Sequence, residues 1–194
     1  MSAATDLPAL SARLAALEAR VQRSEDQTAI RACVNRYMAL CDHLDADTDL
    51  PALLDLFTED AQWRGKGARY AASFGGYQGR AALGEMFSRY MRTPPHFALN
   101  VHFLCSELIE PEGDQARASW LMLQTSTFAS GDSHLNAAQL SLQLQRGADG
   151  RWRIALFETE NLFSRPVSTW TDASALPVPA ATATVPAAAV ASAT

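Results

Sequence analysis

The spacing of apolar residues changes along the chain, and in the first half it is helical. Leu10, Leu14, Leu17 and Val21 recur at intervals of four, three and four residues, which predicts an amphipathic helix within residues 1–27. A coiled coil normally needs about three or four heptads, more than this stripe offers. We therefore expect the helix to pack on the domain or on a partner subunit.

A second helical stripe spans residues 28–42 and ends in a carboxylate, Asp42, one turn after Met38. A carboxylate at the edge of a buried face is poorly solvated and needs a hydrogen-bond donor. Residues 50–57, with Pro51 in the first turn, and residues 80–91 predict two further helices. The glycine-punctuated segment between them suggests a loop or short strand at residues 69–74.

Residues 94–103 have the period of a strand with two different faces. His96, Ala98, Asn100 and His102 share one face, which calls for water, a ligand or polar partners. The opposite face needs protein against it, so we expect a homo-oligomer, a dimer or trimer, formed through that outer face. Its residues are Phe97, Leu99, Val101 and Phe103.

Three more segments alternate as strands, at residues 116–125, 135–146 and 151–158, with turns between them. Helices followed by an antiparallel meander indicate an α+β fold with a pocket on the polar side of the sheet. From residue 167 the chain is rich in Ala, Pro and Thr, which predicts a disordered tail through residue 194.

Composition narrows the choice of partner. The chain has 194 residues, a net charge of −5 and no cluster of Lys or Arg, which argues against nucleic acid or an anionic membrane. No basic and apolar leader opens the sequence, and its three cysteines match no disulfide or metal pattern, so we expect a cytoplasmic protein with free thiols.

Several motifs together resemble the SnoaL-like family of the nuclear transport factor two-like superfamily, over about residues 28–166. The resemblance implies a cone-shaped α+β barrel, in which N-terminal helices pack on a curved, antiparallel or mixed sheet that encloses a pocket. The motifs are the helix Ile30 to Asp42, LLDLFTEDAQW from Leu53, GRAAL from Gly79, HFALN from His96 and DGRWRI from Asp149.

Two enzymes of the family, scytalone dehydratase and hexachlorocyclohexane dehydrochlorinase, pair a histidine and an aspartate that match His96 and Asp42. The resemblance thus implies a catalytic dyad, with His96 as the base and Asp42 orienting it. His102 is assigned a structural role. Tyr37 stands where the dehydrochlorinase has a lysine, and the dehydratase's second histidine has no counterpart in residues 121–128.

The function expected from the resemblance is a cofactor-independent lyase or isomerase, without a metal, that acts on a hydrophobic, cyclic small molecule. The alternative is a noncatalytic binding or assembly subunit, such as the small subunit of a ring-hydroxylating dioxygenase. Two residues are expected to hold a substrate oxygen and three to form pocket walls. These are Asn100 and Tyr37 for the oxygen, and Trp63, Met86 and Trp120 for the walls, with a place in the structural core as the alternative for each of the last three.

Overall fold

A computed structural model describes residues 7–168 and 170 of the chain. It begins with one long helix, α1 (Leu7–Asp42), so the two helical stripes of the first 42 residues belong to a single helix. The predicted disordered tail lies outside the described residues, apart from residues 167, 168 and 170. No helix in the described part of the chain is both long and apolar enough to cross a membrane.

Within the described residues, three short helices and six strands follow α1. Asp49 caps the first of them, because its side chain accepts a hydrogen bond from the Ala52 amide, and Pro51 occupies its first turn. The elements are α2 (Leu50–Leu54), β1 (Phe57–Lys66), α3 (Gly67–Phe74), β2 (Gly76–Gln78), α4 (Gly79–Ser88), β3 (Phe97–Glu112), β4 (Gln115–Phe128), β5 (Ser133–Arg146) and β6 (Trp152–Val167).

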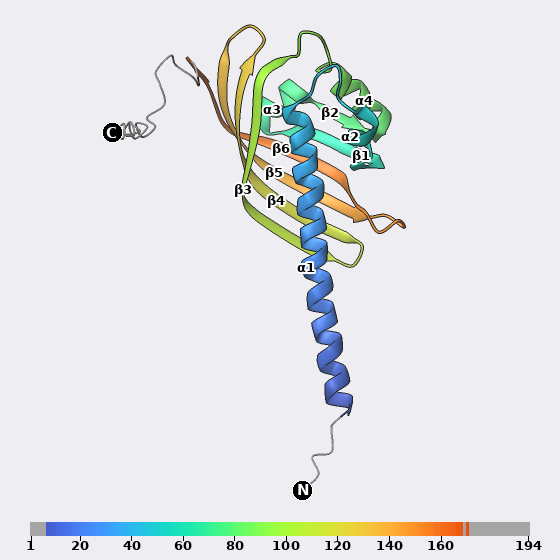
Figure 1. Cartoon of the computed structure of the whole chain (residues 1–194). Coiled ribbons are helices and arrows are strands. Elements are labelled where there is room, and N and C mark those ends of the chain that lie inside the picture. The colour runs from blue at the N-terminus through green and yellow to red at the C-terminus, as the bar shows by residue number, and fades with distance from the viewer. Residues whose placement is uncertain (1–6, 169, 171–194) are drawn as a thin grey trace, which may run out of the picture.

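The strands form one mixed sheet in the order β2-β1-β6-β5-β4-β3. Strands β3 to β6 are an antiparallel meander, and β1 joins β6 in parallel. The predicted α+β fold, with helices packed on a curved sheet, is confirmed, and Figure 1 shows α1 lying across the sheet. The sheet leaves β3 as an edge strand beside α1.

The prediction of a loop or strand at residues 69–74 was wrong, because this segment lies in helix α3. Tyr70 and Phe74 are one helical turn apart, and their rings meet edge to face with centroids 4.8 Å apart. Phe74 also packs edge-on against Trp63 of β1. The flanking glycines favour a loop, but packing of this aromatic pair on Trp63 stabilises a helix here.

Helix α1 packs on the sheet through the second half of its length only. Ile30, Val34, Tyr37 and Met38 are buried there, whereas every residue from Leu7 to Glu25 is exposed. Figure 1 shows the N-terminal part of α1 running beyond the sheet. We call the exposed segment, residues 7–25, the stem.

A buried ionic cluster fixes α1 at the point where the stem leaves the domain. Asp26 Oδ1 accepts hydrogen bonds from Arg146 Nη1 at 2.9 Å and from the Trp152 indole at 3.2 Å. The Arg146 guanidinium also lies over the Trp152 ring, 5.0 Å from its centroid. Asp26 is only 6% exposed, so these hydrogen bonds replace the contacts with water that its side chain loses on folding.

The outer face of β3 is apolar and exposed, as the strand pattern predicts. Leu99 is 40% exposed and Phe103 is 52% exposed. Phe103 pairs with Leu123 on β4, which is itself 37% exposed, so the apolar surface continues across strands. Association of copies through this face stays a prediction.

We expect Asp26→Ala to lower the free energy of unfolding by about 3 kcal/mol, because it removes the acceptor of the Trp152 indole N–H and the more buried of the two carboxylates that bind Arg146. Asp114→Ala is the matched control. Asp114 also bonds Arg146, but its side chain is 78% exposed, so its loss should change stability by less than about 1 kcal/mol. Urea denaturation of both variants measures the difference, and equal losses would contradict the role of the cluster.

Candidate active site

The candidate site forms where the C-terminal turn of α1 meets the free edge of β3. The Asn100 side-chain amide donates to the Cys41 carbonyl at 3.1 Å, and the His102 backbone N–H donates to Asp42 Oδ1 at 3.0 Å. The first bond satisfies a carbonyl that the end of the helix leaves unpaired, and the second satisfies an edge-strand amide. The two elements are thereby fixed against each other.

The same Asp42 oxygen also binds the His102 imidazole, with Nδ1 at 2.6 Å from Oδ1. An ionised carboxylate can only accept hydrogen bonds, so Nδ1 carries the proton of this bond. In the neutral ring, Nε2 is then left with a free lone pair. The His102 side chain is 11% exposed and that of Asp42 is 18% exposed, so both are shielded from bulk water.

The structure corrects the expected partner of Asp42, which binds His102 and not His96. The reason is a β-bulge: the pairing of β3 with β4 shifts register between Phe97 and Leu99. A shift of one residue moves side chains to the opposite face. Phe97 therefore joins Asn100 and His102 among the residues that face the cavity described below, and it leaves the outer face where the alternation placed it.

His96 lies in an aromatic cluster before the strand begins. Its ring packs edge-on against those of Tyr90 and Phe128, with centroids 5.2 and 5.4 Å away, and Arg92 Nη2 lies 3.0 Å from its Nδ1. Burial, and then the charge of Arg92, lower the pKa of His96. A histidine beside a cation and without a carboxylate lacks the partner that would stabilise an imidazolium.

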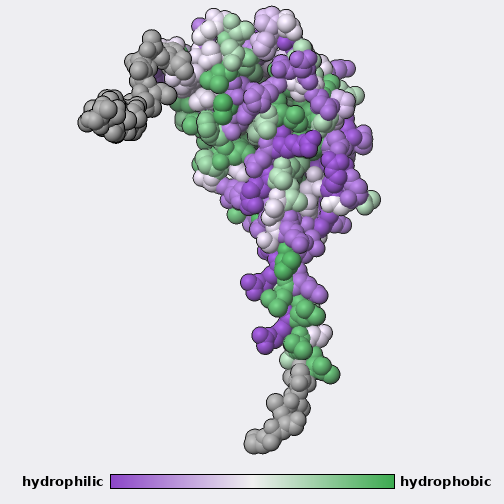
Figure 2. Space-filling model, viewed as in Figure 1, coloured by the Kyte–Doolittle hydropathy of each residue, from purple (hydrophilic) through white to green (hydrophobic). Residues whose placement is uncertain are grey.

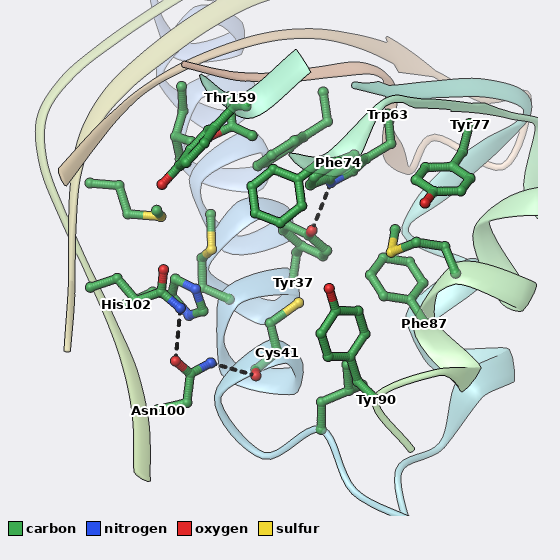
Figure 3. Close-up of a pocket in the computed structure, with 18 of the residues that line it drawn as sticks. Tyr37, Cys41, Trp63, Phe74, Tyr77, Phe87, Tyr90, Asn100, His102 and Thr159 are labelled. Atoms are coloured by element: carbon green, nitrogen blue, oxygen red, sulfur yellow. Dashed lines mark hydrogen bonds between the residues drawn. The ribbon is translucent and has the colours of Figure 1, made fainter. Parts of the chain in front are cut away.

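A cavity of about 280 Å³ opens between α1, the inner face of the sheet and helices α3 and α4. Its volume is near the lower end of the range of about 300–1,000 Å³ found for small-molecule sites. Figure 3 shows His102 and Asn100 on the side opposite Tyr77 and Phe87. Most of the wall is aromatic or sulfur-bearing: Tyr37, Met38, Cys41, Trp63, Tyr70, Phe74, Tyr77, Met86, Phe87, Tyr90, Phe97, Met122 and Phe157.

A family model described as the SnoaL-like domain matches residues 22–158, which is most of the chain. The protein belongs to the SnoaL-like family. No curated protein matches the chain in sequence.

Solved structures share the fold of this SnoaL-like protein. An NTF2-like protein with a cystatin-like fold from Novosphingobium aromaticivorans is 27% identical, with a TM-score of 0.57 over 82% of this chain and 92% of that one. A candidate scytalone dehydratase from N. aromaticivorans DSM 12444 is 16% identical, with a TM-score of 0.60 over 73% and 87%. Hexachlorocyclohexane dehydrochlorinase LinA-type3 from Novosphingobium barchaimii LL02 is 18% identical, with a TM-score of 0.56 over 75% and 94%.

Several other polar groups of the SnoaL-like cavity are held in hydrogen bonds. Asn100 Oδ1 accepts from Gln124 Nε2 and from Ser126 Oγ, both at 2.8 Å, while its amide holds the Cys41 carbonyl. The Trp63 indole donates to the Tyr37 hydroxyl at 3.1 Å, as the dashed line in Figure 3 marks. These bonds fix the walls, and the lining also carries two basic side chains, His102 and Arg89.

Burial changes the acidity of two groups in the cavity wall. It raises the pKa of the Cys41 thiol to about 12, and it raises the pKa of the Tyr37 hydroxyl well above its ordinary value. Both groups therefore stay protonated at neutral pH. Tyr37 can act as a hydrogen-bond donor there, and neither group is a base.

Of the five residues expected to bind substrate, four line the cavity: Tyr37, Asn100, Trp63 and Met86. Trp120 is 2% exposed in the hydrophobic core and is not among the lining residues. Among the described residues, no group of three His, Cys, Asp or Glu side chains is placed to hold a metal ion.

Sequence analysis missed the contact of His102 with Asp42 and the aromatic wall beyond Trp63. The signal for His102 was available, because it lies two residues from Asn100 and so shares its face whatever happens upstream. The aromatic side chains of α3 and α4 reach the cavity only because those helices pack over the sheet. The spacing of apolar residues within each helix does not determine that packing.

We expect thiol reagents at pH 8 to modify Cys105 long before Cys41 or Cys33. Cys105 is exposed, whereas burial raises the pKa of Cys33 to about 11 and that of Cys41 to about 12. A pKa of 12 leaves about one thiol in ten thousand as thiolate at pH 8. Mass spectrometry of labelled peptides over time gives the order, and rapid labelling of Cys41 would contradict the buried wall.

Proposed function

We propose that this SnoaL-like protein is a cofactor-independent lyase or isomerase that removes a proton from carbon with the pair His102 and Asp42. The observation that carries the proposal is the 2.6 Å contact between Asp42 Oδ1 and His102 Nδ1, made by a ring that also lines an aromatic cavity. In this proposal His102 takes the role that the family resemblance implied for His96, and Asp42 keeps its role.

The chemistry follows from the charge that forms during proton transfer. His102 Nε2 takes the proton, and the ring becomes an imidazolium whose positive charge lies beside the Asp42 carboxylate. The electron pair of the broken C–H bond then forms a double bond. In an elimination a leaving group departs from the neighbouring carbon, and in an isomerisation His102 returns the proton to a different carbon.

The cavity wall suggests the substrate class. Aromatic rings and methionines make up most of it, so a hydrophobic small molecule of about one or two rings suits its size. Tyr37 and Asn100 lie in the wall, and Tyr37 is the candidate donor to a substrate oxygen. Asn100 is already engaged by three hydrogen bonds, so we assign it to positioning the wall.

Two structural neighbours carry names that agree with this class of reaction, a candidate scytalone dehydratase and a hexachlorocyclohexane dehydrochlorinase. A dehydratase and a dehydrochlorinase both create a double bond by loss of a proton and a leaving group. At 16% and 18% identity these neighbours support the class only through the shared fold.

We expect His102→Gln to abolish proton abstraction, because the amide cannot accept a proton at neutral pH. Cyclic ketones such as cyclohexanone in D₂O serve as probes, and the rate of exchange of their α-protons is followed by NMR. His96→Gln is the matched control and should retain the parent rate. Exchange that survives in His102→Gln but is lost in His96→Gln would overturn the assignment of the base.

Asp42→Asn should lower the same rate by about two to four orders of magnitude, because the amide removes the charge that stabilises the imidazolium and can favour the wrong tautomer. Its remaining oxygen can still accept the His102 backbone N–H, so the fold should persist. Circular dichroism and thermal melting check the fold. A folded variant with an unchanged rate would contradict the role of Asp42.

The alternative is a noncatalytic binding or assembly subunit. In that case ketone exchange would be no faster than in buffer for the parent protein. Hydrophobic ring compounds would still bind, with an affinity that does not depend on His102.

A further inference from the structure

The stem of α1 carries an apolar stripe that the domain leaves exposed. Leu10, Leu14, Leu17 and Val21 are each between 52% and 56% exposed, and Leu7 is 70% exposed. Figure 2 shows hydrophobic side chains along the part of the helix that extends from the body. The family match begins at residue 22, so the stripe lies outside the SnoaL-like domain.

The stripe points away from its own sheet. Val21 and Ile30 are nine residues apart, which is about two and a half helical turns, so they lie on opposite sides of α1. The same interval separates Leu17 from Asp26. Ile30 and Asp26 are buried against the domain, and the stripe therefore faces the other way. Of the two expected alternatives, packing on the chain's own domain is therefore excluded, and packing on a partner subunit stays a prediction.

The spacing of the stripe is that of a heptad repeat. Leu7, Leu14 and Val21 fall at a positions, and Leu10 and Leu17 fall at d positions. Leucine at d is the choice typical of two-stranded coiled coils. With Leu7 included, the apolar seam spans two full heptads and opens a third, which is short for an isolated coiled coil.

The structure supplies what so short a repeat lacks. The stem is continuous with the half of α1 that packs on the domain. The stem can therefore extend an existing helix and does not need to nucleate a new one, which is the unfavourable step. Asp26 fixes the helix just beyond the stem through Arg146 and Trp152. A helix ordered in advance loses less entropy on association.

The charged residues that flank the apolar seam favour a second copy of the same helix as the partner, in a parallel orientation. Arg13 and Arg20 occupy g positions, and Glu18 and Glu25 occupy e positions. In a parallel pair, each g residue faces the e residue five positions later on the other helix, which matches Arg13 with Glu18 and Arg20 with Glu25. An antiparallel pair would place arginine against arginine and glutamate against glutamate.

We propose that the stem is a docking surface for a second copy of this chain, and that the two stems form a parallel, two-stranded coiled coil through Leu7 to Val21. Opposite charges meet on both flanks of the seam in this arrangement. The two domains lie at the same end of the coiled coil, each on the side of its helix that faces away from the seam. The inference does not depend on the proposed catalytic function.

An engineered disulfide tests the proposal directly. In a Cys105→Ser background, which removes the exposed native thiol, Leu10→Cys places a thiol at a d position. A parallel in-register pair brings the two thiols together, so mild oxidation should convert most of the protein to a covalent dimer on a non-reducing gel. Ala12→Cys, at an exposed f position, is the matched control and should remain largely monomeric on the gel.

Failure of Leu10→Cys to cross-link, or equal cross-linking of the two variants, would overturn the parallel seam. Light scattering of the parent protein must also show more than one copy at micromolar concentration. A monomeric mass would contradict the proposal, and the stripe would then have to bind a different partner.

Charge reversal tests the pairing separately. Arg13→Glu/Arg20→Glu makes both flanks negative, and Glu18→Arg/Glu25→Arg makes both positive, so each variant alone should cross-link through Leu10→Cys at least tenfold more slowly. A mixture of the two should recover the parent rate and give the mixed dimer. Unchanged cross-linking of either variant alone would contradict the ionic selection of a parallel homodimer.

Discussion

The junction between the last turn of α1 and the free edge of β3 determines the rest of the candidate site. Asp42 accepts two hydrogen bonds from His102 on one carboxylate oxygen, one from the backbone amide and one from the ring. Asn100 meanwhile holds the Cys41 carbonyl. A helix end and a sheet edge both carry unpaired backbone groups, and here each partly satisfies the other. The contact of Asp42 with His102, which joins the end of α1 to the edge of β3, therefore also orients the imidazole.

This arrangement places an imidazole, held through Nδ1, in the wall of a mostly aromatic cavity. The part of the chain that the structure describes has no buried side-chain nitrogen or oxygen without a hydrogen-bond partner. Asn100, Gln124 and Ser126 satisfy one another, and Tyr37 pairs with Trp63. The ring of His102 uses one nitrogen for Asp42, and no described protein group bonds to the second. Proton abstraction from carbon, as proposed here, needs a neutral imidazole that is fixed in orientation and shielded from bulk water.

The sequence was sufficient for the α+β fold, the hairpin turns and four residues of the cavity wall, because the faces of helices and strands follow from periods of 3.6 and two residues. It identified Asp42 but assigned it the wrong histidine. The error arose at one place, the bulge between Phe97 and Leu99, where a single extra residue moves everything upstream to the other face. Strict alternation placed His96, Asn100 and His102 together, and the structure keeps only the last two. Helix α3 was missed for a related reason, since the packing of Tyr70 and Phe74 on Trp63 is tertiary.

Asp42 should hold the His102 ring with the proton on Nδ1. Nitrogen-15 NMR of the imidazole side chains, recorded at alkaline pH where histidine is neutral, tests this tautomer without a substrate. We expect the Nδ1–H tautomer for His102 in the parent protein and its loss in Asp42→Ala. An Nε2–H tautomer for His102, or a spectrum of that ring that Asp42→Ala leaves unchanged, would contradict it.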